Sequence, residues 1–127
     1  MATVDLTEKT FADRISSHSI VFVDFWAGWC GPCRQFAPTY AAASEKHSDI
    51  VFGKVDTEAE QQLSAAAAIS SIPTLMAFRD GILVFSQPGA LPGAALEQVI
   101  AAVRGLDMDE VRAHVAEQQT PPASADR

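Results

Sequence analysis

Cysteine and positive charge are both scarce in this sequence of 127 residues. Two cysteines are too few for a scaffold stapled by several disulfides. They supply only half of the about four ligands that a zinc site needs, and none of the three scattered histidines stands at ligand spacing to complete it. Nine Lys and Arg against sixteen Asp and Glu give a net charge of -7, which would repel the phosphates of nucleic acids and anionic membranes. We therefore expect no bound metal, no nucleic-acid partner and no membrane surface.

Long apolar runs are also lacking. The longest is interrupted by Asp24 and is too short to span a membrane. The first residues lack the positively charged segment and apolar core of a signal peptide, so we expect a cytoplasmic protein. In that reducing compartment a cysteine pair is more often catalytic than structural. A hydrophobic fraction of 48% in a chain of this length predicts a single domain with a substantial core.

The two cysteines, Cys30 and Cys33, stand two residues apart after a β-branched and aromatic run at positions 20–26. Such a run predicts a strand that is covered on both faces of a sheet. A chain reversal at residues 27–29 would then place Cys30 at a helix start, partly exposed. Unpaired N–H groups and the helix dipole favour an anion there, so the thiol ionises more easily.

The spacing of the two cysteines also argues against a disulfide with a purely structural role. Cys33 lies about one helical turn beyond Cys30 and can reach its sulfur. A disulfide between them would close a very short loop and so restrict the unfolded chain little. A redox-cycling pair is the better interpretation, because a thiolate attacks disulfides and a thiol does not.

Periodicity along the rest of the chain predicts strands that alternate with helices and end in a hairpin. An Asp-Gly pair at 80–81 is typical of the turn of such a hairpin. Alternation of this kind predicts an α/β fold with a mixed sheet flanked by helices on both faces. The expected strands are 3–6, at the sheet edge, then 20–26, 50–55, 74–78 and 82–86; the expected helices start at 7–8, 33, 56–58 and 92, and the last three end at 47, 68 and 103.

A second set of motifs accompanies the cysteines in a fixed order. It comprises Asp24-Phe25-Trp26-Ala27-Gly28-Trp29-Cys30-Gly31-Pro32-Cys33-Arg34, Pro38, Lys54-Val55-Asp56, Ile72-Pro73-Thr74, Gly81 and Gly89-Ala90. This set resembles the thioredoxin family from about residue 6 to residue 103. The resemblance implies the thioredoxin fold, a thioredoxin domain at 1–105, and a monomer without a bound cofactor. It further implies a protein-disulfide reductase that acts on disulfide-containing targets and is recharged by an NADPH-dependent thioredoxin reductase.

The resemblance also implies roles for individual residues. Cys30 would attack and Cys33 would resolve the mixed disulfide, the two forming a disulfide with each other when oxidised. Asp24 would be the buried carboxylate that takes the proton of Cys33, and Lys54 would modulate its charge. An exposed edge aspartate and an ordinary surface lysine are the plainer alternatives. The remaining site residues would be Trp29, Gly31 and Pro32 in support of the cysteines, and Trp29, Ile72, cis-Pro73, Gly89 and Ala90 at the substrate, whereas Trp26 would pack in the core.

Two other functions use the same motifs. One is a thiol oxidase or isomerase, although Gly31-Pro32 between the cysteines resembles the reducing thioredoxins. The other is a binding or adaptor module on the thioredoxin fold, in which the thiols are dispensable. Departures at Gly28, Ser71 and Pro88 from the residues that many thioredoxins carry concern the range of substrates and not the chemistry.

The residues at 106–127 extend beyond the resemblance. Asp107 and Glu110 form a capping pair, and Met108, Val111 and Val115 fall on one face of a helix. We expect an extra short C-terminal helix followed by a flexible tail from residue 120.

Overall fold

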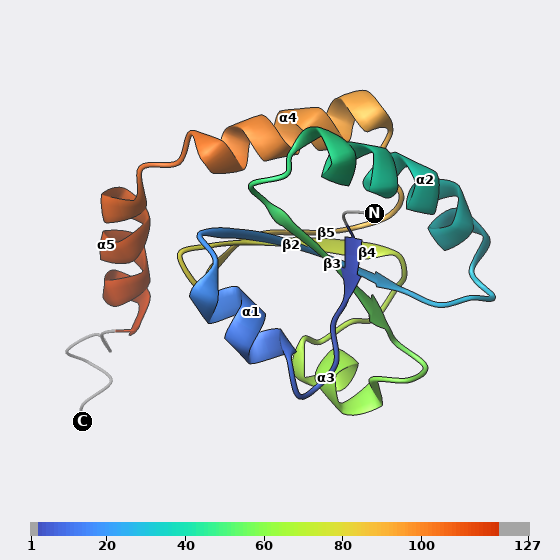
Figure 1. Cartoon of the computed structure of the whole chain (residues 1–127). Coiled ribbons are helices and arrows are strands. Elements are labelled where there is room, and N and C mark those ends of the chain that lie inside the picture. Colours follow the sequence, from blue (N-terminus) through green and yellow to red (C-terminus); the bar gives the residue numbers. More distant parts are fainter. Residues whose placement is uncertain (1–2, 120–127) are drawn as a thin grey trace.

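A computed structural model describes residues 3–119, in which the strands form one mixed sheet between two layers of helices (Figure 1). The sheet order is β1-β3-β2-β4-β5; β1 and β2 run parallel to β3, and the remaining neighbours are antiparallel. The predicted fold class is confirmed. The elements are β1 (Thr3–Asp5), α1 (Phe11–Ser17), β2 (Ile20–Trp26), α2 (Gly31–Lys46), β3 (Val51–Asp56), α3 (Gln61–Ala66), β4 (Thr74–Arg79), β5 (Ile82–Pro88), α4 (Gly93–Arg104) and α5 (Met108–Gln119).

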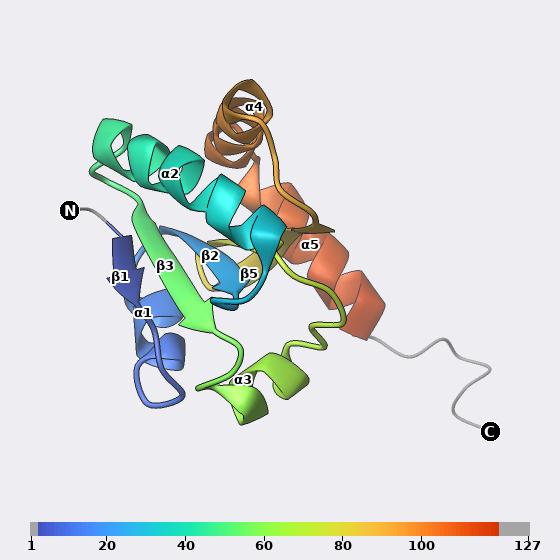
Figure 2. The same cartoon turned by 90° about the vertical axis from the view of Figure 1, so that its right-hand side faces the viewer.

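The central strand β2 separates two apolar layers, because successive side chains of a strand point to opposite faces. One layer lies under α2 and α4, the other under α1 and α3, as two perpendicular views show (Figures 1 and 2). The α2 and α4 layer includes Phe22, Phe36, Tyr40, Phe52 and Leu96. The opposite layer includes Ile15, Val21, Val23, Phe25 and Val55. Asp24, on the α2 side of β2, therefore has a core position.

Two helices begin later than predicted. Thr7 was expected to start α1, but its carbonyl accepts hydrogen bonds from the N–H groups of Thr10 and Phe11 in a turn, and α1 starts at Phe11. Asp56 was expected to cap α3, but its Oδ1 instead accepts the N–H of Glu58. The Glu8 carboxylate accepts the Gln62 N–H at the actual start of α3. A residue that is distant in the sequence therefore accepts a hydrogen bond at this helix start. Local sequence patterns do not reveal such a contact.

Smaller differences concern several other boundaries. The helix α2 begins at Gly31 and remains continuous through Pro38, and α4 starts at Gly93 with Pro92 as its N-cap. The strand β3 is shifted by one residue from the expected range. At the hairpin, Asp80 and Gly81 both have positive φ, 53° and 81°, as the predicted turn between β4 and β5 requires.

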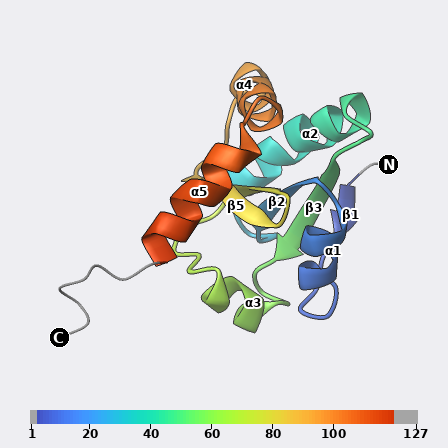
Figure 3. The ribbon, with the colours of Figure 1, turned by 90° about the vertical axis from the view of Figure 1, so that its left-hand side faces the viewer.

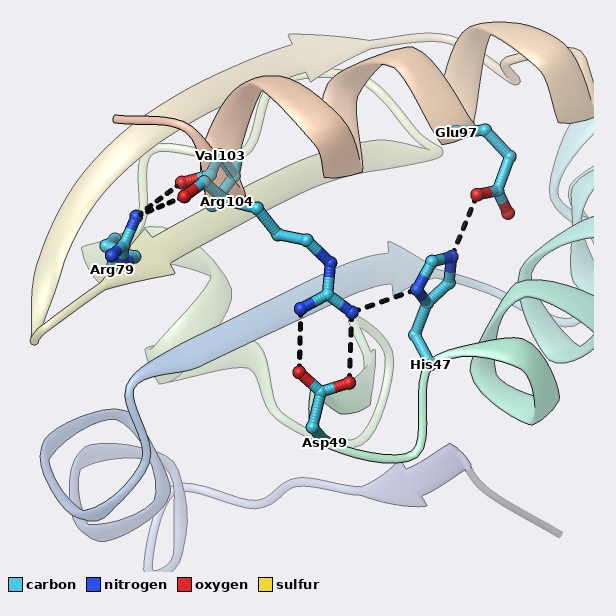
Figure 4. A network of polar contacts seen from close by, with 6 residues as sticks. All are labelled: His47, Asp49, Arg79, Glu97, Val103 and Arg104. Carbon is cyan, nitrogen blue, oxygen red and sulfur yellow. Dashed lines mark hydrogen bonds and ion pairs between the residues drawn. The ribbon is translucent and has the colours of Figure 1, made fainter. Parts of the chain in front are cut away.

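A polar network joins the carboxyl ends of α2 and α4 to the sheet (Figure 4). Arg104 donates to both carboxylate oxygens of Asp49, at 2.7 and 2.9 Å, and to Nδ1 of His47. The hydrogen bonds from Arg104 lower the pKa of Asp49 to about 2. Arg79 in β4 donates to the carbonyls of Val103 and Arg104 at the end of α4. Since the cysteines stand at the other end of α2, we assign this network a structural role.

The predicted extra helix is present as α5 and lies beside the edge strand β5 (Figure 3). The Asp107 carboxylate accepts the N–H groups of Asp109 and Glu110, which confirms the expected cap. Met108 is buried, with 7% of its surface exposed. Arg112 pairs with Asp80 of the hairpin at 3.5 Å. The tail expected from residue 120 lies outside the described residues.

Deletion of the residues after Gly105 should lower the thermal stability of the protein and leave the chemistry expected of the cysteine pair unchanged. Removing the buried Met108 should cost about 2 kcal/mol of unfolding free energy, whereas the exposed ion pair of Arg112 adds little. Thermal denaturation of the shortened chain tests this, with Met108→Ala expected to give most of the loss and Arg112→Ala very little. An unchanged melting temperature would show that α5 does not stabilise the domain.

Candidate active site

Cys30 and Cys33 meet at the amino end of α2, where they form a disulfide with Cα atoms 5.2 Å apart. Cys30 is the N-cap, Gly31 and Pro32 occupy the first helical positions, and Pro32 fits there because its missing N–H would have no partner in the helix. The Cys33 N–H points at Cys30 Sγ, at 3.2 Å. This donor and the positive end of the helix would stabilise a Cys30 thiolate after reduction.

Exposure does not distinguish the two sulfurs, contrary to our expectation. Cys30 is 3% exposed and Cys33 is 2% exposed, so both are buried in the disulfide form. They pack with Ala27, Trp26 and Ile72 in a cluster of their own. What distinguishes them is their place on the helix, since Cys30 accepts an N–H at the cap and Cys33 supplies it.

The loop before β4 lies against Cys30. The Cys30 Sγ lies 3.7 Å from the carbonyl oxygen of Ile72. The bond between Ile72 and Pro73 is cis, as the resemblance implied. The Gly89 N–H donates to the Pro73 carbonyl at 2.7 Å, which brings the loop that contains Ala90 to the same place. Gly89 and Ala90 are exposed. The structure thus brings the predicted substrate-facing residues together beside the disulfide.

Trp29 is a large hydrophobic side chain that lies exposed on this surface, with 68% of its area accessible. Beside it lies a groove of about 380 Å³ between the Trp29 loop, α3 and the loop before β4. Arg34 donates to the Gly28 carbonyl at 2.8 Å and so steadies the Trp29 loop. The α3 wall of the groove could not be predicted from the sequence, because only the tertiary fold brings α3 to Trp29. That wall is made of Gln61, Ser64 and Ala65, and Thr57, Ile69, Ser70, Ser71 and Ile72 complete the lining.

Asp24 is fully buried in β2, with no accessible surface. Its carboxylate oxygens have no hydrogen-bond partner among the described residues. Burial raises its pKa from 3.8 to about 7, and the nearby positive charge of Lys54 limits the rise. Asp24 is therefore not the exposed edge aspartate that we considered, and its proton can exchange near neutral pH.

Lys54 lies directly opposite Asp24 in the parallel pairing of β3 with β2. It is half-buried, and its Nζ lies 4.9 Å from the centre of the Trp26 ring. Trp26 is itself only half-buried and packs against the cysteine cluster, so its predicted role as core packing was incomplete. Its place two residues after Asp24 was the signal that could have put it on the same face of the sheet.

Comparison with known proteins places this arrangement in a family. The family model described as Thioredoxin matches residues 2–102, which include every site residue described above. The chain belongs to the thioredoxin family. Thioredoxins are thiol-disulfide oxidoreductases, and the Cys30–Cys33 disulfide is the redox-active pair of this one.

Individual thioredoxins resemble the chain over most of its length. A Streptomyces coelicolor protein assigned to the thioredoxins is 58% identical over 118 residues, 93% of this chain and 88% of that protein. Thioredoxin of Mycobacterium tuberculosis is 39% identical over 104 residues, 80% of this chain and 90% of that protein. A solved structure of a mutant thioredoxin from Halobacterium salinarum superposes with a TM-score of 0.75 and 30% identity, covering 83% of this chain and 92% of that one. The Streptomyces match extends beyond residue 105, into the segment that contains α5.

Within residues 3–119 no group of three or more His, Cys, Asp or Glu side chains is arranged to hold a metal ion. None of the helices described is both long and apolar enough to cross a membrane.

Proposed function

We propose that this thioredoxin is a general protein-disulfide reductase with the cysteine roles implied by its sequence. The observation that carries the proposal is the Cys30–Cys33 pair at the amino end of α2, next to the Ile72 carbonyl. A thiolate forms most easily on Cys30, because the cap N–H groups and the helix dipole favour its negative charge.

The reaction consists of two thiol-disulfide exchanges. The Cys30 thiolate attacks one sulfur of a target disulfide, so that a Cys30–target bond forms and the other target sulfur leaves as a thiolate. Cys33 then gives up its proton and attacks Cys30 Sγ, which releases the second target thiol and leaves the Cys30–Cys33 disulfide. Two electrons have passed from the cysteine pair to the target.

Asp24 is the base in the second exchange. A carboxyl group with a pKa near 7 is ionised in about half of the molecules at neutral pH and can accept the proton of Cys33. Lys54 stabilises the ionised form of Asp24 and so keeps the pKa from rising further. Trp29, Gly31 and Pro32 shape the surface around the cysteines.

The target binds as an extended segment beside the cysteines. The backbone of Ile72 next to cis-Pro73 would pair with it in the manner of an added strand. Gly89 and Ala90 would line the other side, and the groove beside Trp29 would receive target side chains.

The protein carries no bound cofactor in this proposal. A thioredoxin reductase would return the Cys30–Cys33 disulfide to the dithiol with electrons from NADPH, in the cytoplasm, and the thioredoxin would act as a monomer. The family relationship supports this cycle.

A protein with both cysteines replaced by serine tests the proposal. We expect the reduction of insulin disulfides by dithiothreitol to fall to the rate without protein, whereas an adaptor would retain binding of its partners. The reduction potential of the wild-type pair should be about -270 mV, the value typical of thioredoxin and taken from the family. Full activity of the variant would refute the proposal, and a potential near about -120 mV would favour an oxidase.

A further inference from the structure

Three side chains on one face of the sheet meet next to the disulfide. Asp24 and Trp26 share this face because they are two residues apart on β2, and the strand pairing sets Lys54 of β3 opposite Asp24. The Lys54 ammonium lies 4.9 Å from the centre of the Trp26 ring, within the range of a cation–π contact. Trp26 also packs against the cluster formed by Cys30 and Cys33. A single ring thus packs against the cluster that contains the redox pair and also contacts the lysine that pairs with Asp24.

We propose that Trp26 is a positioning residue for the proton transfer, whose ring holds the Lys54 ammonium beside the Asp24 carboxylate. The proposal rests on the function proposed above for Asp24. Packing against the cysteine cluster would not by itself give Trp26 this positioning role.

The chemistry of lysine gives the reason for such an anchor. Its ammonium is strongly hydrated and stands on a flexible stem, so a half-buried lysine tends to extend its head into water. An ammonium that leaves the sheet face acts more weakly on Asp24, because water screens its charge. The indole ring offers the most favourable aromatic face for a cation.

Hydrogen bonding by the indole N–H does not explain why position 26 is a tryptophan. Trp26 Nε1 is buried and has no hydrogen-bond partner among the described residues. An unpaired buried N–H is unfavourable compared with an apolar ring. The contribution that remains is the ring face, which Lys54 occupies.

The surroundings of Asp24 leave Lys54 as the cation that acts on it. Burial and the charge of Asp24 raise the pKa of the Tyr40 hydroxyl on α2, which donates to the Gly53 carbonyl at 2.8 Å. From β3, Asp56 pairs with Trp26, and its carboxylate accepts the Glu58 N–H. The β4 residue opposite Asp24 is the apolar Leu75. The α2 cysteines are joined in the disulfide and carry no charge.

Replacement of Trp26 by leucine has two possible effects on Asp24, and these have opposite signs. If Trp26 only excluded water, the variant would admit water and lower the pKa of Asp24. If Trp26 holds Lys54, the variant would release the ammonium and raise that pKa. We expect a rise of about half a pH unit, which corresponds to the strength of a partly exposed cation–π contact.

The experiment is a double-mutant cycle on the oxidised protein, read by NMR titration of the Asp24 carboxyl carbon. Trp26→Leu should raise the pKa in the wild-type background and fail to raise it when Lys54 is already methionine. Trp26→Phe, which keeps an aromatic face and is the milder change, should give a smaller rise. A fall, no change, or an equal rise in both backgrounds would overturn the proposal.

Two further measurements distinguish a failure of this proposal from a failure of the proposed function and from misfolding. Ring currents should shift the ε-methylene protons of Lys54 in the wild type, and Trp26→Leu should abolish that shift; a Lys54 signal unshifted in the wild type would overturn the positioning role. The pH profile of mixed-disulfide release should move with the pKa of Asp24. If turnover requires Cys30 but Trp26→Leu leaves that profile in place, only the positioning role is wrong. Disulfide reduction without the cysteines would instead refute the proposed function.

Discussion

Cys33→Ser should convert this thioredoxin into a trap that stays joined to its targets by a mixed disulfide through Cys30. The first exchange needs only the Cys30 thiolate, and we expect the amino end of α2 to hold the pKa of the reduced Cys30 thiol below that of a free cysteine. The second exchange needs Cys33, so the target remains attached when its thiol is absent. Cys30→Ser should form no adducts, and both variants should lose turnover entirely.

Non-reducing electrophoresis and mass spectrometry of each variant incubated with oxidised targets measure this difference. The pH dependence of alkylation of the reduced protein adds a second test. Both sulfurs are buried in the disulfide form, so a faster reaction of Cys30 at neutral pH would reflect its ionisation at the helix end. Equal trapping by the two variants would contradict the assigned order.

The parts of the site that are local in the chain could be predicted from the sequence. The β-branched run gave β2 with its observed ends, because a strand covered on both faces must be apolar throughout. In the same run Asp24 is the one charged residue among apolar ones, and the structure buries it completely. Cys30 stands at a helix start because the turn and Pro32 are encoded beside it.

The parts that depend on distant segments could not be predicted. The Glu60 carboxylate accepts the Glu8 N–H at 2.9 Å, and Glu8 in turn serves the start of α3. These contacts decide where α3 begins and therefore which residues form the groove beside Trp29. The contact of Trp26 with Lys54 likewise depends on the register of β2 and β3, which periodicity does not give.

Asp24→Asn should stabilise the protein at alkaline pH and not at acidic pH. Burial raises the pKa of Asp24 from 3.8 to about 7 in the folded protein. Ionisation of Asp24 therefore destabilises the folded protein. The effect is absent below about pH 4, grows between about pH 4 and pH 7, and is complete above that range. This rise of the pKa destabilises the folded protein by about 4 kcal/mol at pH 8, a cost that asparagine removes.

Denaturant unfolding of the oxidised proteins between about pH 4 and pH 8 measures this dependence. A buried amide without a partner adds a cost that does not change with pH, so the slope is the diagnostic quantity. Asp49→Asn is the matched control, because Arg104 lowers the pKa of that carboxyl to about 2 and the variant cannot gain stability as the pH rises. A constant difference between Asp24→Asn and the wild type would show that Asp24 ionises with the same pKa in the folded and the unfolded protein, so that burial does not raise it.

The same variant should release its targets slowly even though its fold is more stable. An asparagine cannot take the proton of Cys33, and loss of a general base reduces the rate of such a step by about 100-fold. Pre-formed mixed disulfides of the two proteins, followed by the appearance of free target thiols, isolate the second exchange from the first. The wild-type rate should rise with pH through about pH 7, where Asp24 ionises, and the variant should lack that rise. Equal rates at pH 7 would mean that Cys33 gives its proton directly to water. Asp24 would then be a buried charge without a catalytic task.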